Sequence, residues 1–306
     1  MNTATLAVQL AGFVAAPLLQ SVVNRTKALL AGRRGAPLLQ PYYDLWKLLR
    51  KGAVYSQTTT WLFRLGPLLG LSAIATALLL VPVGKLPAPF TFGGDIFVLA
   101  ALLALGRFAT VTAALDTGSS FEEMGGSREV TFAVLAEPAF FLTLAVLALV
   151  TRSLSLTDML GPGLADAWRG GIAPALVLAM GALGVVLLAE NSRIPFDDPN
   201  THLELTMVHE VMVLDHSGPD LAFILYGASL KLFLFAGLLA SMVLPFHTGS
   251  AAGDALVYFA GVLMVGIVLG LIESLRARVR MPQAPQVLLA AMLFGALGMT
   301  LALAVR

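Results

Sequence analysis

The segment that decides the fold is 171–204. Its first part is the apolar run GIAPALVLAMGALGVVLLA (171–189), and its second is the charged stretch ENSRIPFDDPNTHLE (190–204). A bilayer core about 30 Å thick needs roughly 20 apolar residues per helix, so the first part is a candidate membrane span. Another apolar run, Leu221–Leu244, follows. The charged stretch is therefore predicted to lie in a loop at the membrane surface, between two spans.

The remainder of the chain has the same membrane character. Hydrophobic residues make up 58% of the 306 positions and charged residues 12%, against about 25% charged in soluble domains. The mean hydropathy is +0.86. The candidate spans are Ala4–Val23, Leu65–Val83, Ile96–Leu115, Val130–Val150, Gly171–Ala189, Leu221–Leu244, Ala255–Leu271 and Gln286–Val305. The expected fold is all-α, a polytopic membrane protein with about eight transmembrane helices. No repeat relates the two halves, as it would in an inverted-repeat transporter.

The basic residues predict the orientation. They gather in the first loop and in alternate loops on the same side of the membrane. By the positive-inside rule these odd-numbered loops are cytoplasmic, and both termini lie on the other side. We expect one integral membrane domain (1–306), with a cytoplasmic amphipathic loop (24–64) and charged cytoplasmic loops at 116–129 and 190–220.

The first loop contains a short amphipathic pattern. From Tyr42 onward, apolar residues recur at spacings of three and four among basic residues, which is typical of a helix at the membrane interface. Trp46 and the tyrosines suit the headgroup level. The helix would either anchor the loop or line a binding cavity.

Acidic residues are concentrated in and after the charged stretch. Charge at a membrane boundary is costly unless it is paired or used, so this cluster is a candidate functional site. A solvated loop is the alternative, although Pro195 and Pro199 would stiffen it. Asp197 and Asp198 are expected to cap the following helical turn, and Glu190 to pair with Arg193. The candidates for proton transfer or coupling here are Glu190, Asp197, Asp198, Glu204, Glu210 and Asp215.

Four further charges fall in or beside predicted spans. Glu137 lies inside the fourth span, where a carboxylate is either protonated or paired, and it could serve proton transfer or structure. Glu129 is eight residues earlier and about 12 Å away along a helix, so a relay would need Arg128, another side chain or several waters. Lys231 and Arg107 each require an acidic partner. Lys231 is open to either role, and Arg107 is interpreted as structural.

Several classes of function are excluded or disfavoured. The chain has no cysteine and so offers no thiolate ligand for a metal or an iron–sulfur cluster. A net charge of +1 gives no indication of nucleic-acid binding. His209 and Glu210 lack the second histidine of a zincin helix, so no metal site is expected. Glu273 could pair with Arg276.

Three blocks carry a resemblance to a known family. They are Arg33-Arg34-Gly35 with Leu39-Gln40-Pro41, Asp44 and Lys47-Leu48-Leu49; Ser127-Arg128-Glu129 with Glu137; and Glu190 with Arg193, Pro195-Phe196-Asp197, Glu204-Leu205 and Ser217-Gly218. In this order the blocks resemble the family that unites membrane subunit 1 of proton-pumping NADH:quinone oxidoreductase with formate hydrogenlyase subunit 4. The short first loop, Leu115-Asp116-Thr117-Gly118-Ser119 and Ser229-Leu230-Lys231 are similar to its hydrogenase-4-like branch.

The resemblance implies a non-catalytic membrane subunit in a prokaryotic inner (cytoplasmic) membrane. Its implied partners are hydrogenase-like large and small subunits, an iron–sulfur subunit and antiporter-like membrane subunits. The [NiFe] centre and the iron–sulfur clusters would then lie on those partners, and this chain would bind none. Arg33, Arg34, Asp44, Lys47, Arg107, Arg128, Arg193 and Glu273 would pair charges or support the structure.

Three alternatives stay open. In a quinone-reducing complex, the charged loop would form the wall of a quinone chamber. In an independent secondary transporter, it would be a substrate or ion gate. In a purely structural anchor, proton movement would be confined to neighbouring subunits, and neutralising Glu137 or Glu204 would leave coupling intact.

Overall fold

The computed structural model is almost entirely helical and describes residues 3–84, 86–197, 208–245, 248–277, 279 and 283–305. Within these ranges, eight helices are long and apolar enough to cross a membrane. They are α1 (Thr3–Leu30), α3 (Trp61–Leu78), α4 (Asp95–Asp116), α5 (Ser120–Thr151), α8 (Ala173–Glu190), α9 (Gly218–Val243), α10 (Ala251–Leu275) and α11 (Ala284–Ala304). The predicted fold class, an all-α protein with eight spans, is confirmed.

Shorter elements connect the spans. The helix α2 (Gln40–Leu49) lies in the first loop, where the amphipathic pattern predicted a helix. On the opposite side of the bundle, α6 (Leu156–Met159) and α7 (Pro162–Arg169) form part of the connection between α5 and α8. The 3₁₀ helix η1 (Glu210–Val213) precedes α9.

Two helices extend beyond the predicted spans. The fourth span was expected from Val130, but α5 begins at Ser120, so most of the segment expected as a charged loop at 116–129 is helical. Likewise α1 continues to Leu30, which places Arg25 and Lys27 on a helix rather than in the loop. Hydropathy identifies only the apolar part of a helix, whereas α-helical hydrogen bonding continues outside the membrane.

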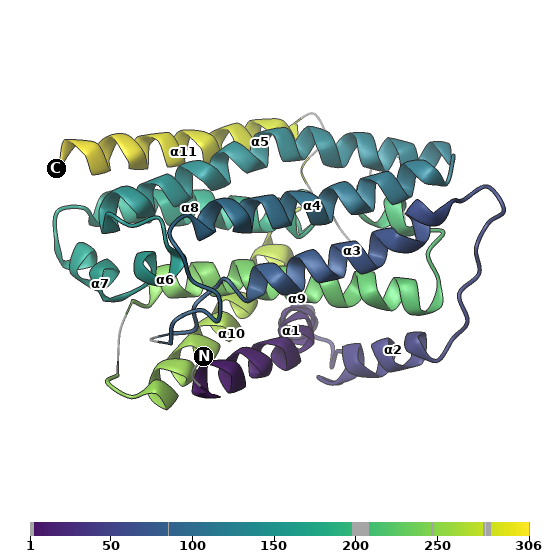
Figure 1. Cartoon of the computed structure of the whole chain (residues 1–306), viewed down its shortest axis with the longest axis horizontal. Helices are drawn as coiled ribbons and strands as arrows, with labels where there is room; N and C mark the ends of the chain where they lie inside the picture. Colours follow the sequence, from purple (N-terminus) through teal and green to yellow (C-terminus); the bar gives the residue numbers. More distant parts are fainter. Residues whose placement is uncertain are drawn as a thin grey trace.

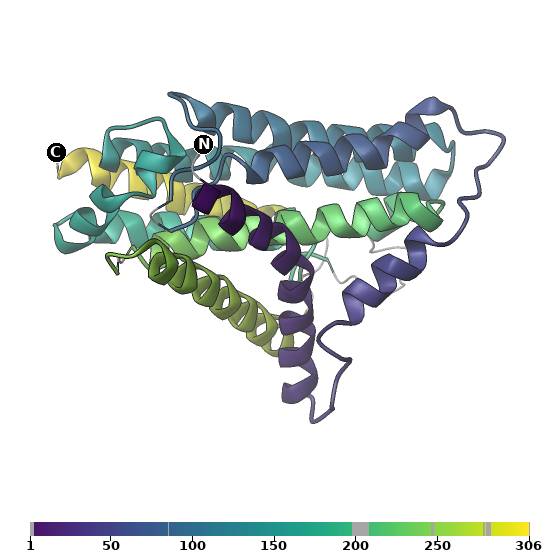
Figure 2. The same ribbon diagram turned by 60° about the horizontal axis from the view of Figure 1, so that its bottom comes forward.

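Most of the spans form one elongated bundle, and α1, α2 and α10 lie on one side of it. In Figure 1, α3, α4, α5, α8, α9 and α11 run close to the long axis. In Figure 2, α1 bends sharply and its second half diverges from the bundle beside α10, with α2 between it and the rest. Residues of α1, α2, α3 and α9 line a common cavity.

The bend in α1 has an identifiable cause. Pro17 lies inside the helix and has no N–H, so the carbonyl of Phe13 loses its helical donor. The hydroxyl of Tyr226 on α9 donates to this carbonyl at 3.1 Å, and the hydroxyl of Tyr42 on α2 donates to the next one, on Val14. Two tyrosines therefore supply donors at the bend and fix α2 and α9 against α1.

Close helix packing elsewhere depends on small residues. A Cβ added to Gly66 on α3 would lie 2.7 Å from the Cβ of Ala113 on α4, so only glycine permits this approach. Gly218, at the start of α9, has φ +55°, and an added Cβ would lie 2.7 Å from the carbonyl oxygen of Gly52. Beside it, the hydroxyl of Ser217 accepts a hydrogen bond from the N–H of Val54 at 3.0 Å. The end of the first loop is thus held against the start of α9.

Candidate functional site

Arg107 lies at the centre of a largely buried group of charges. Its guanidinium hydrogen-bonds Glu137 of α5 and Glu190 at the end of α8, and its Nε lies 3.6 Å from a carboxylate oxygen of Glu129. The side chain of Arg107 is only 9% exposed. Arg107 is therefore the side chain that links Glu129 to Glu137, a link that the sequence left open between Arg128, another residue and water.

Lys231 of α9 completes the group. Its ammonium lies 2.8 Å from the second carboxylate oxygen of Glu190, whose side chain is 7% exposed, so this carboxylate contacts two cations. Three carboxylates (Glu129, Glu137 and Glu190) and two cations (Arg107 and Lys231) give a formal charge of −3 + 2 = −1. We call these five residues the charged cluster. A net charge at this depth is costly, so the cluster favours one shared proton or a cation nearby.

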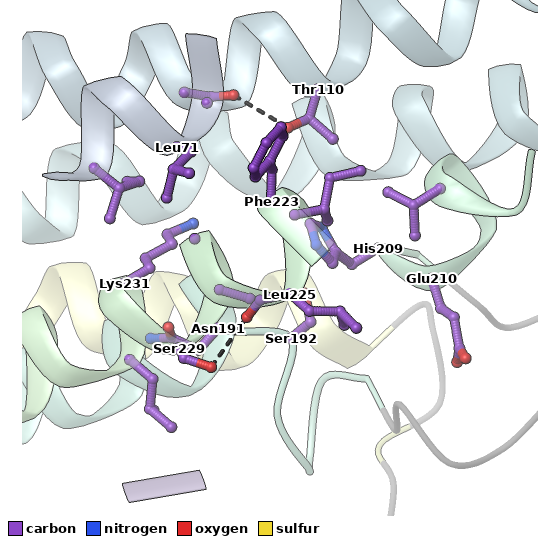
Figure 3. A pocket seen from close by; sticks show the side chains of 18 of the residues that line it. Leu71, Thr110, Asn191, Ser192, His209, Glu210, Phe223, Leu225, Ser229 and Lys231 are labelled. Carbon is purple, nitrogen blue, oxygen red and sulfur yellow. Dashed lines mark hydrogen bonds between the residues drawn. The ribbon is translucent and has the colours of Figure 1, made fainter. Parts of the chain in front are cut away.

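A cavity of about 410 Å³ adjoins the charged cluster. Its polar lining includes Arg107, Glu129, Glu190 and Lys231, together with Asp44, Asn191, Arg193, Asp197, His209 and Glu210. Leu71, Ile74, Phe223 and Leu225 contribute apolar walls. In Figure 3, Lys231 and His209 lie on different sides of the cavity, and the Glu210 side chain extends away from both. The cavity therefore joins the residues around the charged loop to the ion pairs between the spans.

A smaller pocket, of about 200 Å³, lies on the other side of the ion pairs. Its lining includes Phe97, Phe140, Phe141 and Phe235, as well as Arg107, Glu137 and Glu190. Arg107 and Glu190 line both spaces, and the Glu137 side chain is 44% exposed. The charged cluster therefore extends from the cavity to a surface of the bundle formed by α4 and α5.

Asp197 and His209 shape the cavity wall on the side of the charged loop. One carboxylate oxygen of Asp197 accepts the backbone N–H groups of Val208 and His209, each at 3.2 Å. Asp197 therefore holds the chain that enters η1, eleven and twelve residues later, and the turn that it was expected to cap lies outside the described residues. Burial, and to a lesser extent the charge of Lys231, lower the pKa of His209 to about 4. The ring is therefore neutral at pH 7.

Glu273 forms a second buried ion-pair network. It pairs with Lys27 of α1 at 2.7 Å and with Arg193 at 3.2 Å, and Arg193 also donates to Gln20. The sequence instead predicted ion pairs between Glu273 and Arg276 and between Glu190 and Arg193. Those predictions relied on short sequence separations, whereas the folded chain brings α1 and α10 beside the residues that follow α8. This network fixes one edge of the cavity.

The other candidate residues are spread over the molecule. Asp215 lies outside the cavity lining, and its N–H donates to Glu122, a buried carboxylate of α5 that was not predicted to be a site residue. The guanidinium of Arg128 lies 3.1 Å from the sulfur of Met124. Arg33, Arg34 and Lys47 are exposed. Asp198 and Glu204 lie outside the described residues. Among the described residues, no group of three His, Asp or Glu side chains could hold a metal ion.

Comparison with known proteins places this arrangement in a family. The family model described as NADH dehydrogenase matches residues 3–304. The chain belongs to the NADH dehydrogenase family. It is 33% identical to hydrogenase-4 component C of Escherichia coli (strain K12), over 86% of this chain and 84% of that protein. It is 31% identical to formate hydrogenlyase subunit 4 of the same organism, over 90% of each chain. These matches confirm the resemblance seen in the three sequence blocks.

A solved structure confirms the fold of this family member. A chain from the structure of the membrane-bound sulfane sulfur reductase, an archaeal respiratory membrane complex, superposes with a TM-score of 0.82. The match covers 98% of both chains at 18% identity. The protein is thus a multi-pass membrane subunit of the kind found in complex I-like assemblies.

Proposed function

We propose that this chain is the non-catalytic membrane anchor and coupling subunit of a complex I-like, hydrogenase-type redox-driven ion pump. It links a hydrophilic [NiFe]-hydrogenase-like arm, with its iron–sulfur clusters, to antiporter-like membrane subunits. The arm docks on the cytoplasmic loops, in a prokaryotic inner membrane. Both termini lie on the opposite side. The redox centres belong to the partner subunits.

The observation that supports coupling is the charged cluster itself. It holds three carboxylates for two cations, so the position of one proton among Glu129, Glu137 and Glu190 is set by the local field. A redox step beside the cavity would change that field and shift the proton affinity of the nearest acids. Because Arg107 contacts all three carboxylates, a change at the cavity end affects Glu137 at the surface of the bundle.

The test is ion translocation in inside-out vesicles that contain the native complex. In E137Q and E190Q, electron transfer through the arm is expected to continue while the number of ions moved per electron falls, because a glutamine side chain cannot take up or release a proton as a carboxyl group does. The matched control is D166N, which alters an exposed carboxylate of α7. Unchanged ion movement in assembled E137Q and E190Q complexes would refute the coupling role and would favour a purely structural anchor.

A quinone-chamber subunit is the second candidate. The cavity volume of about 410 Å³ and its apolar walls favour it, because sites for small organic ligands usually measure about 300–1,000 Å³. Nickel content, measured beside H₂-dependent and quinone-dependent electron transfer in the gently solubilised complex, separates the two. Nickel with H₂ chemistry and no quinone reduction supports the hydrogenase type. Quinone reduction without nickel supports the quinone chamber.

A further inference from the structure

The helix α2 has two chemically different faces. At 100° per residue, Pro41, Asp44 and Leu45 lie on one side of it, and all three line the cavity. Tyr43 and Trp46 lie on the other side, and they are 61% and 60% exposed. The single acidic residue of this helix therefore faces inward, and its largest aromatic side chains face outward.

The outer face is surrounded by cations. The segment 31–51 carries five basic residues and one carboxylate, that of Asp44 on the cavity side. The five are exposed, and in the part of the chain that the structure describes they form no ion pair: Arg33, Arg34, Lys47, Arg50 and Lys51. The guanidinium of Arg50 lies over the ring of Trp46, 4.7 Å from its centre. The outer face thus combines apolar rings with uncompensated positive charge.

The position of α2 determines what can cover this face. The hydroxyl of Tyr42 donates to the Val14 carbonyl of α1, a helix long and apolar enough to cross a membrane, so α2 packs against a span rather than away from the bundle. Figure 2 shows α2 as an inclined helix at the edge of the molecule. Tryptophan and tyrosine favour the headgroup region, and arginine matches the geometry of a phosphate. Basic side chains near an anionic leaflet are attracted to it.

We propose that the outer face of α2, with the five cations of segment 31–51, binds the headgroups of anionic phospholipids in the adjacent leaflet. The aromatic rings lie among the headgroups and upper acyl chains, while the cations hold the phosphates. The inner face of the same helix forms part of the cavity wall. Lipid composition at this face therefore affects the geometry of the cavity.

The test uses the full chain in lipid nanodiscs made with a tryptophan-free scaffold protein, and Trp46 is the only tryptophan of the W61F/W168F variant. Brominated phosphatidylglycerol or brominated phosphatidylcholine is added at equal mole fraction to a phosphatidylcholine host. Both lipids are expected to quench Trp46, and the anionic lipid about threefold more strongly, because several cations enrich it locally. The matched control is Trp168 alone (W46F/W61F), on the opposite side of the bundle, where the two lipids are expected to quench equally.

Two further measurements test whether the five cations cause the preference for the anionic lipid. The R33Q/R34Q/K47Q/R50Q/K51Q substitutions should abolish the preference for the anionic lipid while quenching by both lipids persists. High ionic strength should also abolish the preference for the anionic lipid in the chain that keeps all five cations. The proposal can therefore be tested even if the fivefold variant does not fold. Equal quenching by both lipids at low salt overturns the proposal. The proposal is also overturned if aqueous iodide quenches Trp46 and neither lipid does.

Discussion

Arg107→Gln should be among the most damaging single substitutions in the membrane-spanning part of this protein. It removes the guanidinium that contacts Glu129, Glu137 and Glu190, and leaves three carboxylates with only Lys231. The formal charge of the cluster changes from −1 to −3 + 1 = −2. Removing one partner of a buried ion pair costs about 3–5 kcal/mol. Each kcal/mol corresponds to a change of about 2–4 °C in melting temperature for a chain of this general size.

The expected result is a fall in melting temperature on the order of 10 °C for the purified chain in detergent, followed by the fluorescence of an apolar-sensitive dye. The matched control is R169Q, since the Arg169 side chain is 80% exposed and its pair with Asp166 at 3.9 Å contributes little. The double variant R107Q/E137Q returns the cluster to a charge of −1 and should recover part of the loss. A melting temperature of R107Q equal to that of R169Q, or a double variant less stable than R107Q, would refute this account of the cluster.

Three further predictions concern other parts of the fold. Gly218→Ala should lower the free energy of unfolding by about 1–3 kcal/mol, because φ is +55° and the added Cβ would meet the Gly52 carbonyl. The control is Gly184→Ala, where the added Cβ meets open space and stability should not fall. Equal effects of the two substitutions would contradict the packing argument. Burial lowers the pKa of His216 to about 4 from its usual 6.5. The stabilisation from the neutral ring is therefore complete above pH 6.5 and is lost as the pH falls towards 4, a loss on the order of 3 kcal/mol. The melting temperature of H216F should depend less on pH over that range. Tyr226→Phe should cost about 1–3 kcal/mol by removing the donor to the Phe13 carbonyl, whereas Tyr43→Phe, on the exposed face of α2, should leave the melting temperature unchanged.

The sequence predicts the spans well because membrane insertion depends on composition over about 20 residues. The eight predicted segments correspond to the eight long helices, and the pattern after Tyr42 identifies α2. The extra helical turns at Ser120–Glu129 are missed because they are polar, and a hydropathy window does not detect helix outside the membrane. The short helices α6 and α7 are missed for a related reason, since neither is long or apolar enough to give a signal.

The candidate site was harder to predict. The sequence shows that Arg107, Glu137 and Lys231 are charges within spans and that each needs a partner. It does not show that α4, α5, α8 and α9 bring these charges to one point, because that depends on which helices are neighbours. Arg107 was therefore interpreted as structural, although it contacts all three carboxylates of the cluster. Gln20 and Lys27 carry no sequence signal, since their partners, Arg193 and Glu273, lie far along the chain from them.

The most direct test of the central claim is whether a carboxyl group of the charged cluster changes its protonation when the complex turns over. Redox-triggered infrared difference spectroscopy of the native complex detects the C=O stretch of protonated carboxylic acids. The account predicts a carboxyl band that appears or shifts upon electron transfer and that is lost in E137Q or E190Q but retained in D166N. A difference spectrum without a carboxyl band, or one that is identical in all three variants, would contradict it.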